Sequence, residues 1–224
     1  NHLTMKSCIL IVGIVFLSLL TNAQFDLVSQ EMGVTVLHEG TDWGNGASFY
    51  DFNHDGWDDL TTANGDSVIK FFQNDATGTL VEIQLQLPEI EYAQVKAIVW
   101  VDYDNDGDSD LFFSQNDGRL YLLNNDGNFD FTDVTAEVGI STQSYKYYGV
   151  AFADVNKDGY LDFYISKYYN PIQYPQAEFS SVFYMNTGFG TFVDATVAAG
   201  LFQPASPSFQ PVFFDFDKDG DLDL

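Results

Sequence analysis

The stretch Asp102-Tyr103-Asp104-Asn105-Asp106-Gly107-Asp108-Ser109-Asp110 places Asp at positions 1, 3, 5 and 9 and Gly at position 6. The same spacing recurs at 51–59, 154–162 and 215–223, with Asn at position 3 in two copies. Carboxylates this dense repel one another unless a cation lies among them. Oxygen ligands around a sharp Gly turn suit a hard cation of calcium size. One isolated copy would fit an Asp-rich turn equally well, whereas four copies predict four calcium sites.

Each copy is expected to bind Ca²⁺ through the side chains of positions 1, 3, 5 and 9 and the backbone carbonyl of position 7. A carbonyl is present in every residue, which explains why position 7 varies. Asn in place of Asp at position 3 lowers the charge of two sites and is expected to lower their affinity. The predicted ligands are Asp51, Asn53, Asp55, Trp57 and Asp59; Asp102, Asp104, Asp106, Asp108 and Asp110; Asp154, Asn156, Asp158, Tyr160 and Asp162; and Asp215, Asp217, Asp219, Asp221 and Asp223.

Other cation-binding motifs fit this pattern less well. An EF-hand requires a bidentate Glu at position 12, and that position holds Thr62, Phe113 and Ile165 in the first three copies. The flanks also lack a helical pattern. Magnesium is disfavoured because it rarely uses an all-protein cage.

The net charge is strongly acidic, at -25 from 33 acidic and 8 basic residues. Nucleic acids and anionic membranes reward basic patches, and the basic residues here are scattered. The composition therefore argues against nucleic-acid binding.

Residues 1–23 have the layout of upstream residues followed by a secretory signal peptide. Met5-Lys6 precede the apolar run from Cys8 to Leu20, and cleavage is expected after Ala23. A membrane anchor is the alternative reading, but the run is short and lacks a basic flank. The expected product is secreted or on the cell surface, with no transmembrane segment after cleavage and with one propeller-repeat domain over 24–224. It contains no cysteine, so no disulfide is expected.

The spacing of the loops predicts the fold. Their first Asp residues are at 51, 102, 154 and 215, and periods near 50 residues indicate an array of one supersecondary unit. Four short runs rich in aromatic and β-branched residues recur in each unit, which is typical of strands. We therefore predict an all-β fold, a β-propeller of four-stranded antiparallel blades, with the calcium loop joining the first two strands of each blade. The alternative is a linear β-solenoid, whose repeats are usually shorter.

The expected strands have the following ranges. The first strands are expected at 47–50, 98–101, 150–153 and 212–214, the second at 60–62, 111–113 and 163–165, the third at 68–72, 120–123 and 182–185, and the fourth at 80–83, 129–134 and 192–197.

Three complete blades and part of a fourth are expected, so the chain is interpreted as an N-terminal fragment of a ring. Residues 25–34 parallel 131–140 and 192–201, each with Phe at the start and Gly eight residues later. We therefore expect 25–29 to act as a fourth strand that completes the last blade of the ring and removes an exposed edge.

With the loops and strands placed, the chain resembles the FG-GAP/VCBS repeat family, the integrin-α-like propeller repeats. The stretch Tyr148-Gly149-Val150-Ala151-Phe152-Ala153-Asp154 and the loop after it look like one such repeat. The stretch 123–140 is similar to the subset found with cartilage acidic protein and ASPIC/UnbV proteins. The resemblance implies an extracellular, calcium-dependent scaffold for adhesion or for carbohydrate-rich partners. A Gly-Ala-Pro tripeptide of the family is missing at its expected place.

Recognition is expected on the face opposite the calcium loops, where loops rich in aromatic residues emerge. These are an insertion at 168–179, the residues Tyr145 and Tyr147, and the stretch 203–211. Exposed aromatics of this kind suit an extracellular protein or carbohydrate ligand, although a self-packed loop is the plainer interpretation. Trp43, Trp57 and Trp100 are expected to pack within or between blades.

No catalytic site is predicted. His38 and His54 are interpreted as surface side chains, and Glu89 with Glu91 as exposed residues of a connection. The predicted function is therefore a secreted, non-catalytic calcium-binding scaffold. The alternative is the propeller domain of a larger secreted polysaccharide-acting enzyme with its active site elsewhere.

Overall fold

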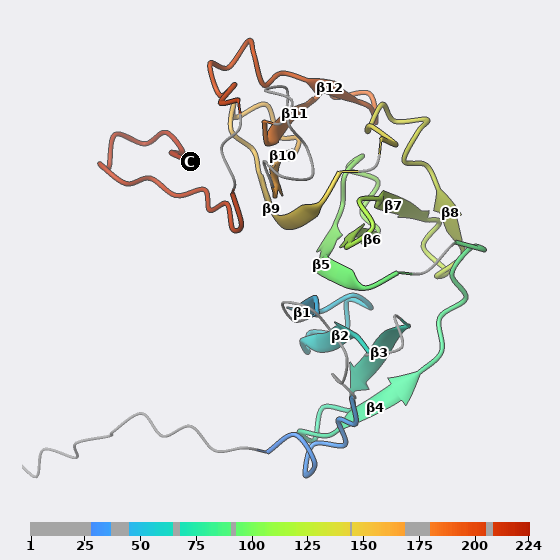
Figure 1. Ribbon diagram of the computed structural model, residues 1–224. Helices are drawn as coiled ribbons and strands as arrows, with labels where there is room; N and C mark the ends of the chain where they lie inside the picture. The colour runs from blue at the N-terminus through green and yellow to red at the C-terminus, as the bar shows by residue number, and fades with distance from the viewer. Residues whose placement is uncertain are drawn as a thin grey trace, which may run out of the picture.

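The computed structural model describes residues 28–36, 45–64, 68–90, 93–143, 145–168, 180–204 and 208–224. Within these ranges the chain is all-β, with three four-stranded antiparallel sheets in which neighbours in sequence are neighbours in space. Figure 1 shows the sheets side by side in an arc, like the blades of a propeller. The described part holds no helix that is long and apolar enough to cross a membrane. The predicted signal peptide lies outside the described residues.

Each blade starts at its innermost strand and ends at its outermost one (Figure 1). Blade 1 comprises β1 (Ala47–Tyr50), β2 (Asp59–Ala63), β3 (Ile69–Asn74) and β4 (Leu80–Ile83); blade 2 comprises β5 (Val95–Val101), β6 (Asp110–Gln115), β7 (Leu120–Asn125) and β8 (Phe131–Asp133); blade 3 comprises β9 (Tyr147–Ala153), β10 (Asp162–Lys167), β11 (Val182–Asn186) and β12 (Phe192–Asp194).

The predicted propeller blades are thus confirmed, with different strand lengths. The inner strands β5 and β9 start three residues earlier than expected, and the outer strands β8 and β12 end earlier. The outer strands stop because the chain folds into a tight turn directly after them. Of the fourth blade, the described residues form an isolated bridge between Phe214 and Asp223.

The apolar cores lie between neighbouring blades, so the second strands are buried on both faces. Trp100 illustrates this packing: its ring stacks on Phe52 at 4.9 Å, and its Nε1–H donates to Thr61 Oγ1 of blade 1 at 2.8 Å. Its predicted packing role is confirmed. Trp57 is 50% exposed, so the same prediction was wrong there, because the Asp-rich loop at 51–59 carries this side chain past the ends of the strands. Trp43 lies outside the described residues.

A turn with the same hydrogen bonds occurs at 28–34, 134–140 and 195–201. In the 134–140 copy, backbone bonds join Val138 N to Val134 O and Ile140 N to Thr135 O, and the other two copies repeat them. This copy follows β8 of blade 2 but supports blade 3, since the N–H of Phe192 donates to Val138 O at 2.7 Å.

The 28–34 turn supports blade 1 in the same way, because the N–H of Leu80 donates to Met32 O at 2.7 Å. Both turns need Gly at the contact: a Cβ on Gly33 or Gly139 would lie 2.7 or 2.6 Å from a backbone oxygen of the supported strand. The N-terminal turn therefore stands where the exit of a preceding blade's fourth strand would stand. This placement supports the ring-closure hypothesis, which stays a prediction because residues 25–27 lie outside the described part.

Candidate metal centres and ligand-binding face

The four Asp-rich loops, named loop 1 (51–59), loop 2 (102–110), loop 3 (154–162) and loop 4 (215–223), share one backbone path. In all four, position 4 has a left-handed φ between 59° and 65°, and the Gly at position 6 has a φ between 90° and 94°. Glycine adopts that conformation without a Cβ penalty. The path turns the chain so that the side chains of positions 1, 3 and 5 point into the loop.

Backbone N–H groups hold these side chains in place. In loop 3, the N–H of Asp158 donates to Asp154 Oδ1 and Asn156 Oδ1, each at 3.0 Å, and the N–H of Gly159 donates to Asp154 Oδ2 at 2.9 Å. Loops 1 and 2 repeat these bonds, and loop 4 repeats two of them, from Asp219 N–H to Asp217 Oδ1 and from Gly220 N–H to Asp215 Oδ2. The loops are therefore pre-shaped with their oxygen atoms gathered.

The Asp at position 9 joins each loop to the body of its blade. Asp59, Asp110 and Asp162 are fully buried, and Oδ1 of each accepts the backbone N–H of the Asn that ends the third strand, at 2.8 to 2.9 Å. Burial raises the pKa of all three carboxyls, that of Asp110 to about 7, against the opposing effect of these hydrogen bonds.

The asparagines Asn74, Asn125 and Asn186 end the third strands, directly before the hairpin turns. They also hold the loop, because the side-chain amide of Asn125 donates to Ser109 O at 3.0 Å and that of Asn186 to Tyr103 O of blade 2 at 2.8 Å. The signal was present in the sequence as an Asn at the same place in every repeat, directly before each hairpin turn.

Position 3 divides the loops into two kinds. In the Asn-type loops, 1 and 3, the amide of Asn53 or Asn156 donates to the position-5 carboxylate at 3.1 or 2.9 Å. The Asp-type loops, 2 and 4, have no such donor. Each of them gathers three carboxylates with an oxygen atom of each within 4.8 Å of the others. The groups are Asp102, Asp104 and Asp106, and Asp215, Asp217 and Asp223.

The residues of the loops fit a hard divalent cation. All side-chain donors are carboxylate or amide oxygens, which calcium prefers. Two carboxylate oxygens, Asp59 Oδ2 and Asp215 Oδ1, are shielded from solvent and have no hydrogen-bond partner among the residues that the structure describes. Buried charged oxygen atoms are costly unless they are paired or bind a metal. Burial, together with the charges of Asp106 and Asp102, also raises the pKa of Asp104.

The side chains at position 7 point away from the gathered oxygens, as expected of a carbonyl ligand. Tyr160 lies against the hairpin turn of its own blade, where a Cβ on Gly188 would be 3.1 Å from its ring. Asp108 lies against Gly127 in the equivalent place of blade 2. The part of the position-7 carbonyls in metal binding stays a prediction.

Position 4 links each loop to the next one. His54 Nε2 lies 3.0 Å from Ser109 Oγ of loop 2, Asn105 Nδ2 donates to Gly159 O of loop 3 at 2.8 Å, and Lys157 Nζ contacts Asp221 of loop 4 at 2.7 Å. His54 is exposed, as predicted, but its ring has a partner that the sequence analysis missed. The left-handed φ at this position turns the side chain toward the neighbouring blade, and no single-loop pattern reveals that contact.

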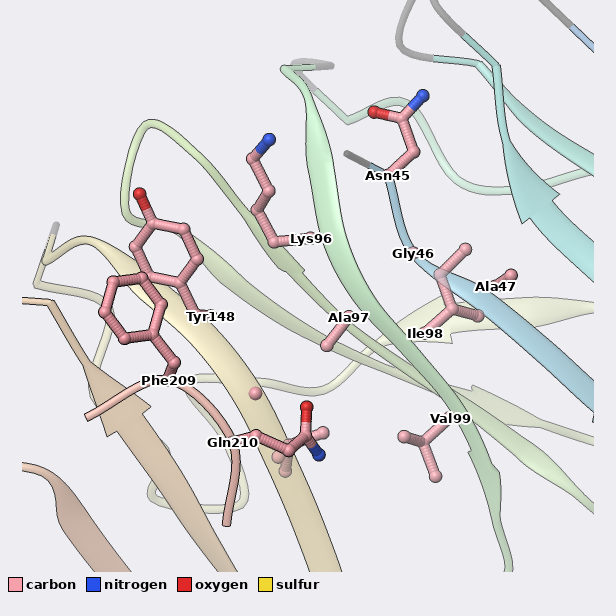
Figure 2. Close-up of a pocket in the computed structure, with 12 residues that line it drawn as sticks. Asn45, Gly46, Ala47, Lys96, Ala97, Ile98, Val99, Tyr148, Phe209 and Gln210 are labelled. Carbon is pink, nitrogen blue, oxygen red and sulfur yellow. The ribbon is translucent and has the colours of Figure 1, made fainter. Parts of the chain in front are cut away.

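The opposite face carries a cavity of about 440 Å³ between the inner strands. Figure 2 shows residues of β1, β5 and β9 around it, with Lys96 and Tyr148 at one side and Phe209 beside Tyr148. Small residues line the strands here. A Cβ on Gly149 would lie 2.4 Å from Phe209 O, so this glycine lets the segment carrying Phe209 approach β9.

Three aromatic rings cluster beside this cavity. The ring centroids of Tyr148, Tyr168 and Phe209 lie 5.2 to 5.6 Å apart. Tyr168 and Phe209 come from the two segments in which a binding surface was predicted. Tyr169, Tyr174 and the rest of the insertion at 169–179, with 205–207, lie outside the described residues, as do His38 and Glu91.

Tyr147 and Tyr145 depart from their predicted exposure. Tyr147 is only 1% exposed, because β9 starts early enough to pair it with Lys167 and turn its ring into the core between blades 2 and 3. Tyr145 is half-buried and lies 4.0 Å from Lys167 Nζ, measured to the ring centroid. The prediction that Tyr147 belongs to an exposed face was wrong.

Comparisons with known proteins agree with this architecture. A family model described as FG-GAP-like repeat matches residues 51–113 and 102–165. Each match runs from the first Asp of a loop into the second strand of the next blade. Cartilage acidic protein 1 from Mus musculus is 28% identical over 116 residues, that from Xenopus tropicalis 28% over 120, and that from Homo sapiens 27% over 116. The alignments cover 52%, 54% and 52% of this chain but only 17%, 17% and 16% of those proteins.

Proposed function

Because the chain belongs to the FG-GAP-like repeat family, we propose that it is a calcium-stabilised propeller scaffold that binds a ligand outside the cell and catalyses no reaction. The observation that carries the metal part is the convergence of Asp102, Asp104 and Asp106 within 4.8 Å. Three carboxylates in one loop repel one another, and a bound cation turns that repulsion into attraction. The apolar leader at 1–23 supports export, and extracellular fluid supplies calcium at concentrations that such sites use.

The ligand is proposed to bind opposite the calcium loops. Tyr148 and Phe209 line the cavity of Figure 2, Tyr168 packs against both rings, and Lys96 and Asn45 supply polar groups at the cavity edge. Rings with a polar tip beside a concave surface suit a sugar or a protein loop. In this arrangement calcium fixes the blades from one side while recognition takes place on the other.

Elemental analysis of the purified protein tests the metal part. We expect bound calcium, which a chelator removes together with much of the thermal stability. A protein that carries no calcium and melts at the same temperature in EDTA would refute it.

Capture assays with Tyr148→Ala and Phe209→Ala test the binding part, using an array of glycans and extracellular proteins. Both variants are expected to lose the retained ligand while melting like the parent chain. Phe189→Ala is the matched control, because Phe189 is 90% exposed on the hairpin turn of blade 3, away from the ring cluster. Equal retention by all three variants would place the binding surface elsewhere.

A further inference from the structure

Lys167 is a buried cation that forms no ion pair or side-chain hydrogen bond with a described residue, although the charge of Asp194 acts to raise its pKa. It ends β10 on the face opposite the calcium loops and is 8% exposed. Its Nζ has no carboxylate within 4.0 Å and no hydrogen-bond acceptor among the described residues, and its neighbours are the rings of Tyr145 and Tyr147, at 4.0 and 5.7 Å. Removing an ammonium group from water is costly unless a counter-charge replaces the water.

A cavity of about 300 Å³ lies beside this side chain. Its lining includes the Ser180, Ser181 and Thr196 side chains, with Val197 and Phe202 on the apolar side. Burial lowers the pKa of Lys167 to about 8, so the amine is still largely protonated at pH 7. The cavity therefore offers a positive charge, hydroxyl groups and an apolar wall in a chain of net charge -25.

Two further polar groups belong to the same neighbourhood. The hydroxyl of Tyr147 is buried and has no hydrogen-bond partner within the described part of the chain. Asp194 lines the cavity, and its Oδ1 is held by the N–H and Oγ–H of Thr196 at 3.0 and 2.6 Å. Its other oxygen remains able to accept a hydrogen bond, such as one from a ligand hydroxyl group.

We propose that this cavity binds a carboxylated sugar, with Lys167 as the counter-ion of the carboxylate and Asp194 as an acceptor for a sugar hydroxyl. A ligand that carries both groups, as a uronic acid does, matches a cation and an acceptor that line one small cavity. The apolar side, Val197 and Phe202, suits the C–H face of a sugar ring. The choice of a sugar rests on the proposed ligand-binding function, whereas the carboxylate position rests on Lys167 alone.

Isothermal titration with glucuronic acid tests the proposal, with its methyl ester, glucose and N-acetylglutamate as comparison ligands. Glucuronic acid is expected to bind, and the ester and glucose to bind at least roughly tenfold more weakly, because charge-assisted hydrogen bonds are among the strong ones. Lys167→Met should lower the affinity for glucuronic acid roughly tenfold to a hundredfold. Lys146→Met is the matched control, since it removes an equal charge nearby but does not line the cavity.

A second variant keeps the proposal testable if Lys167→Met does not fold. Val197 is 76% exposed at the cavity edge, so Val197→Glu leaves the core intact. The new carboxylate is expected to repel the carboxylate of glucuronic acid and to lower its affinity. Unchanged binding in both variants, or no binding to the parent chain, overturns the proposal. Equal binding of N-acetylglutamate overturns the sugar assignment. Retention of neutral glycans through the Tyr148 cluster without uronic acid binding would overturn this inference and leave the proposed function standing.

Discussion

The Asn-type and Asp-type loops follow the same backbone path but satisfy their charges differently. In the Asn-type loops, an amide N–H₂ lies where the Asp-type loops have a second carboxylate oxygen, and it donates to the position-5 Asp. In the Asp-type loops, three carboxylates face one another without such a donor. The exchange of one polar group therefore removes one side-chain hydrogen bond from the Asp-type loops and adds one carboxylate to them, while the backbone hydrogen bonds of loops 1, 2 and 3 stay the same. The Asp-type loops are accordingly expected to bind calcium more tightly and to lose more order without it.

Removal of all calcium is expected to have the largest effect. At a tenfold excess of calcium over Kd, one site adds about 1.4 kcal/mol to the free energy of unfolding. Four sites together correspond to a fall in Tm of roughly 10–20 °C for a chain of this size. Melting curves recorded along a calcium titration check this and sharpen the comparison. The melting temperature is expected to rise in two steps as calcium is added, because the Asp-type loops should fill first. A rise in a single step would remove the distinction between the loops.

Asp104→Asn should convert loop 2 into an Asn-type loop. We expect its calcium affinity to fall roughly tenfold, because the charge of the ligand set decreases. The free energy of unfolding of the calcium-free protein should increase by about 1 kcal/mol, since the new amide is expected to donate a hydrogen bond to Asp106 as Asn53 donates to Asp55. Titration calorimetry and chemical unfolding measure the two effects. Asn156→Asp is the reciprocal variant and should change both quantities in the opposite direction; the same direction in both variants would contradict the comparison.

The pH dependence should differ between the calcium-free and calcium-loaded protein. The pKa of Asp110 is raised to about 7 in the folded protein by burial, so the folded state binds more protons than the unfolded state between about pH 4 and pH 7. The stability of the calcium-free protein should therefore decrease as the pH rises through this window. Calcium competes with protons for the same carboxylates, so the stabilisation by calcium should increase over that range.

Differential scanning calorimetry at pH 5, 6, 7 and 8 tests this, on protein stripped of metal and on protein with added calcium. Asp110→Asn should flatten the calcium-free profile, because it removes a carboxyl group whose raised pKa, about 7, lies within this window. A calcium-free protein that becomes more stable as the pH rises to 7 would show that Asp110 is ionised throughout.

The contact between Lys157 and Asp221 should have the smallest effect. Both side chains are exposed, and exposed ion pairs contribute about 0–1 kcal/mol. Lys157→Met should therefore change the Tm by no more than a few degrees, although it removes the link between loops 3 and 4. Titration calorimetry of this variant measures calcium binding to loop 4. The measurement sharpens the comparison, because the order of an Asp-type loop should depend on its metal far more than on Lys157.

The fold followed from the sequence because its signals are periodic. The loops begin at 51, 102, 154 and 215, and the strand runs flank them in the same order each time, so blades of four strands could be predicted. The loop geometry also followed, since Asp, Asn and Gly at fixed positions specify the turn. The role of position 4 did not, because His54, Asn105 and Lys157 differ in type and each bonds to a residue more than fifty positions away. The burial of Tyr147 was missed for a related reason: β9 begins where Tyr147 pairs with Lys167 of β10, and that pairing lies beyond the strand expected at 163–165.

The turn at 134–140 has a consequence for how the chain divides into modules. It follows the last strand of blade 2, yet its carbonyl holds the outer strand of blade 3, just as the turn at 28–34 holds β4. A segment that keeps such a turn together with the strand that it holds therefore begins directly after the fourth strand of one blade, at 134, and ends with the fourth strand of the next, at 194. Duplication or circular permutation with a cut at that point would move intact modules, whereas a cut between the turn and the first strand of the next blade would separate the turn from the strand that it holds.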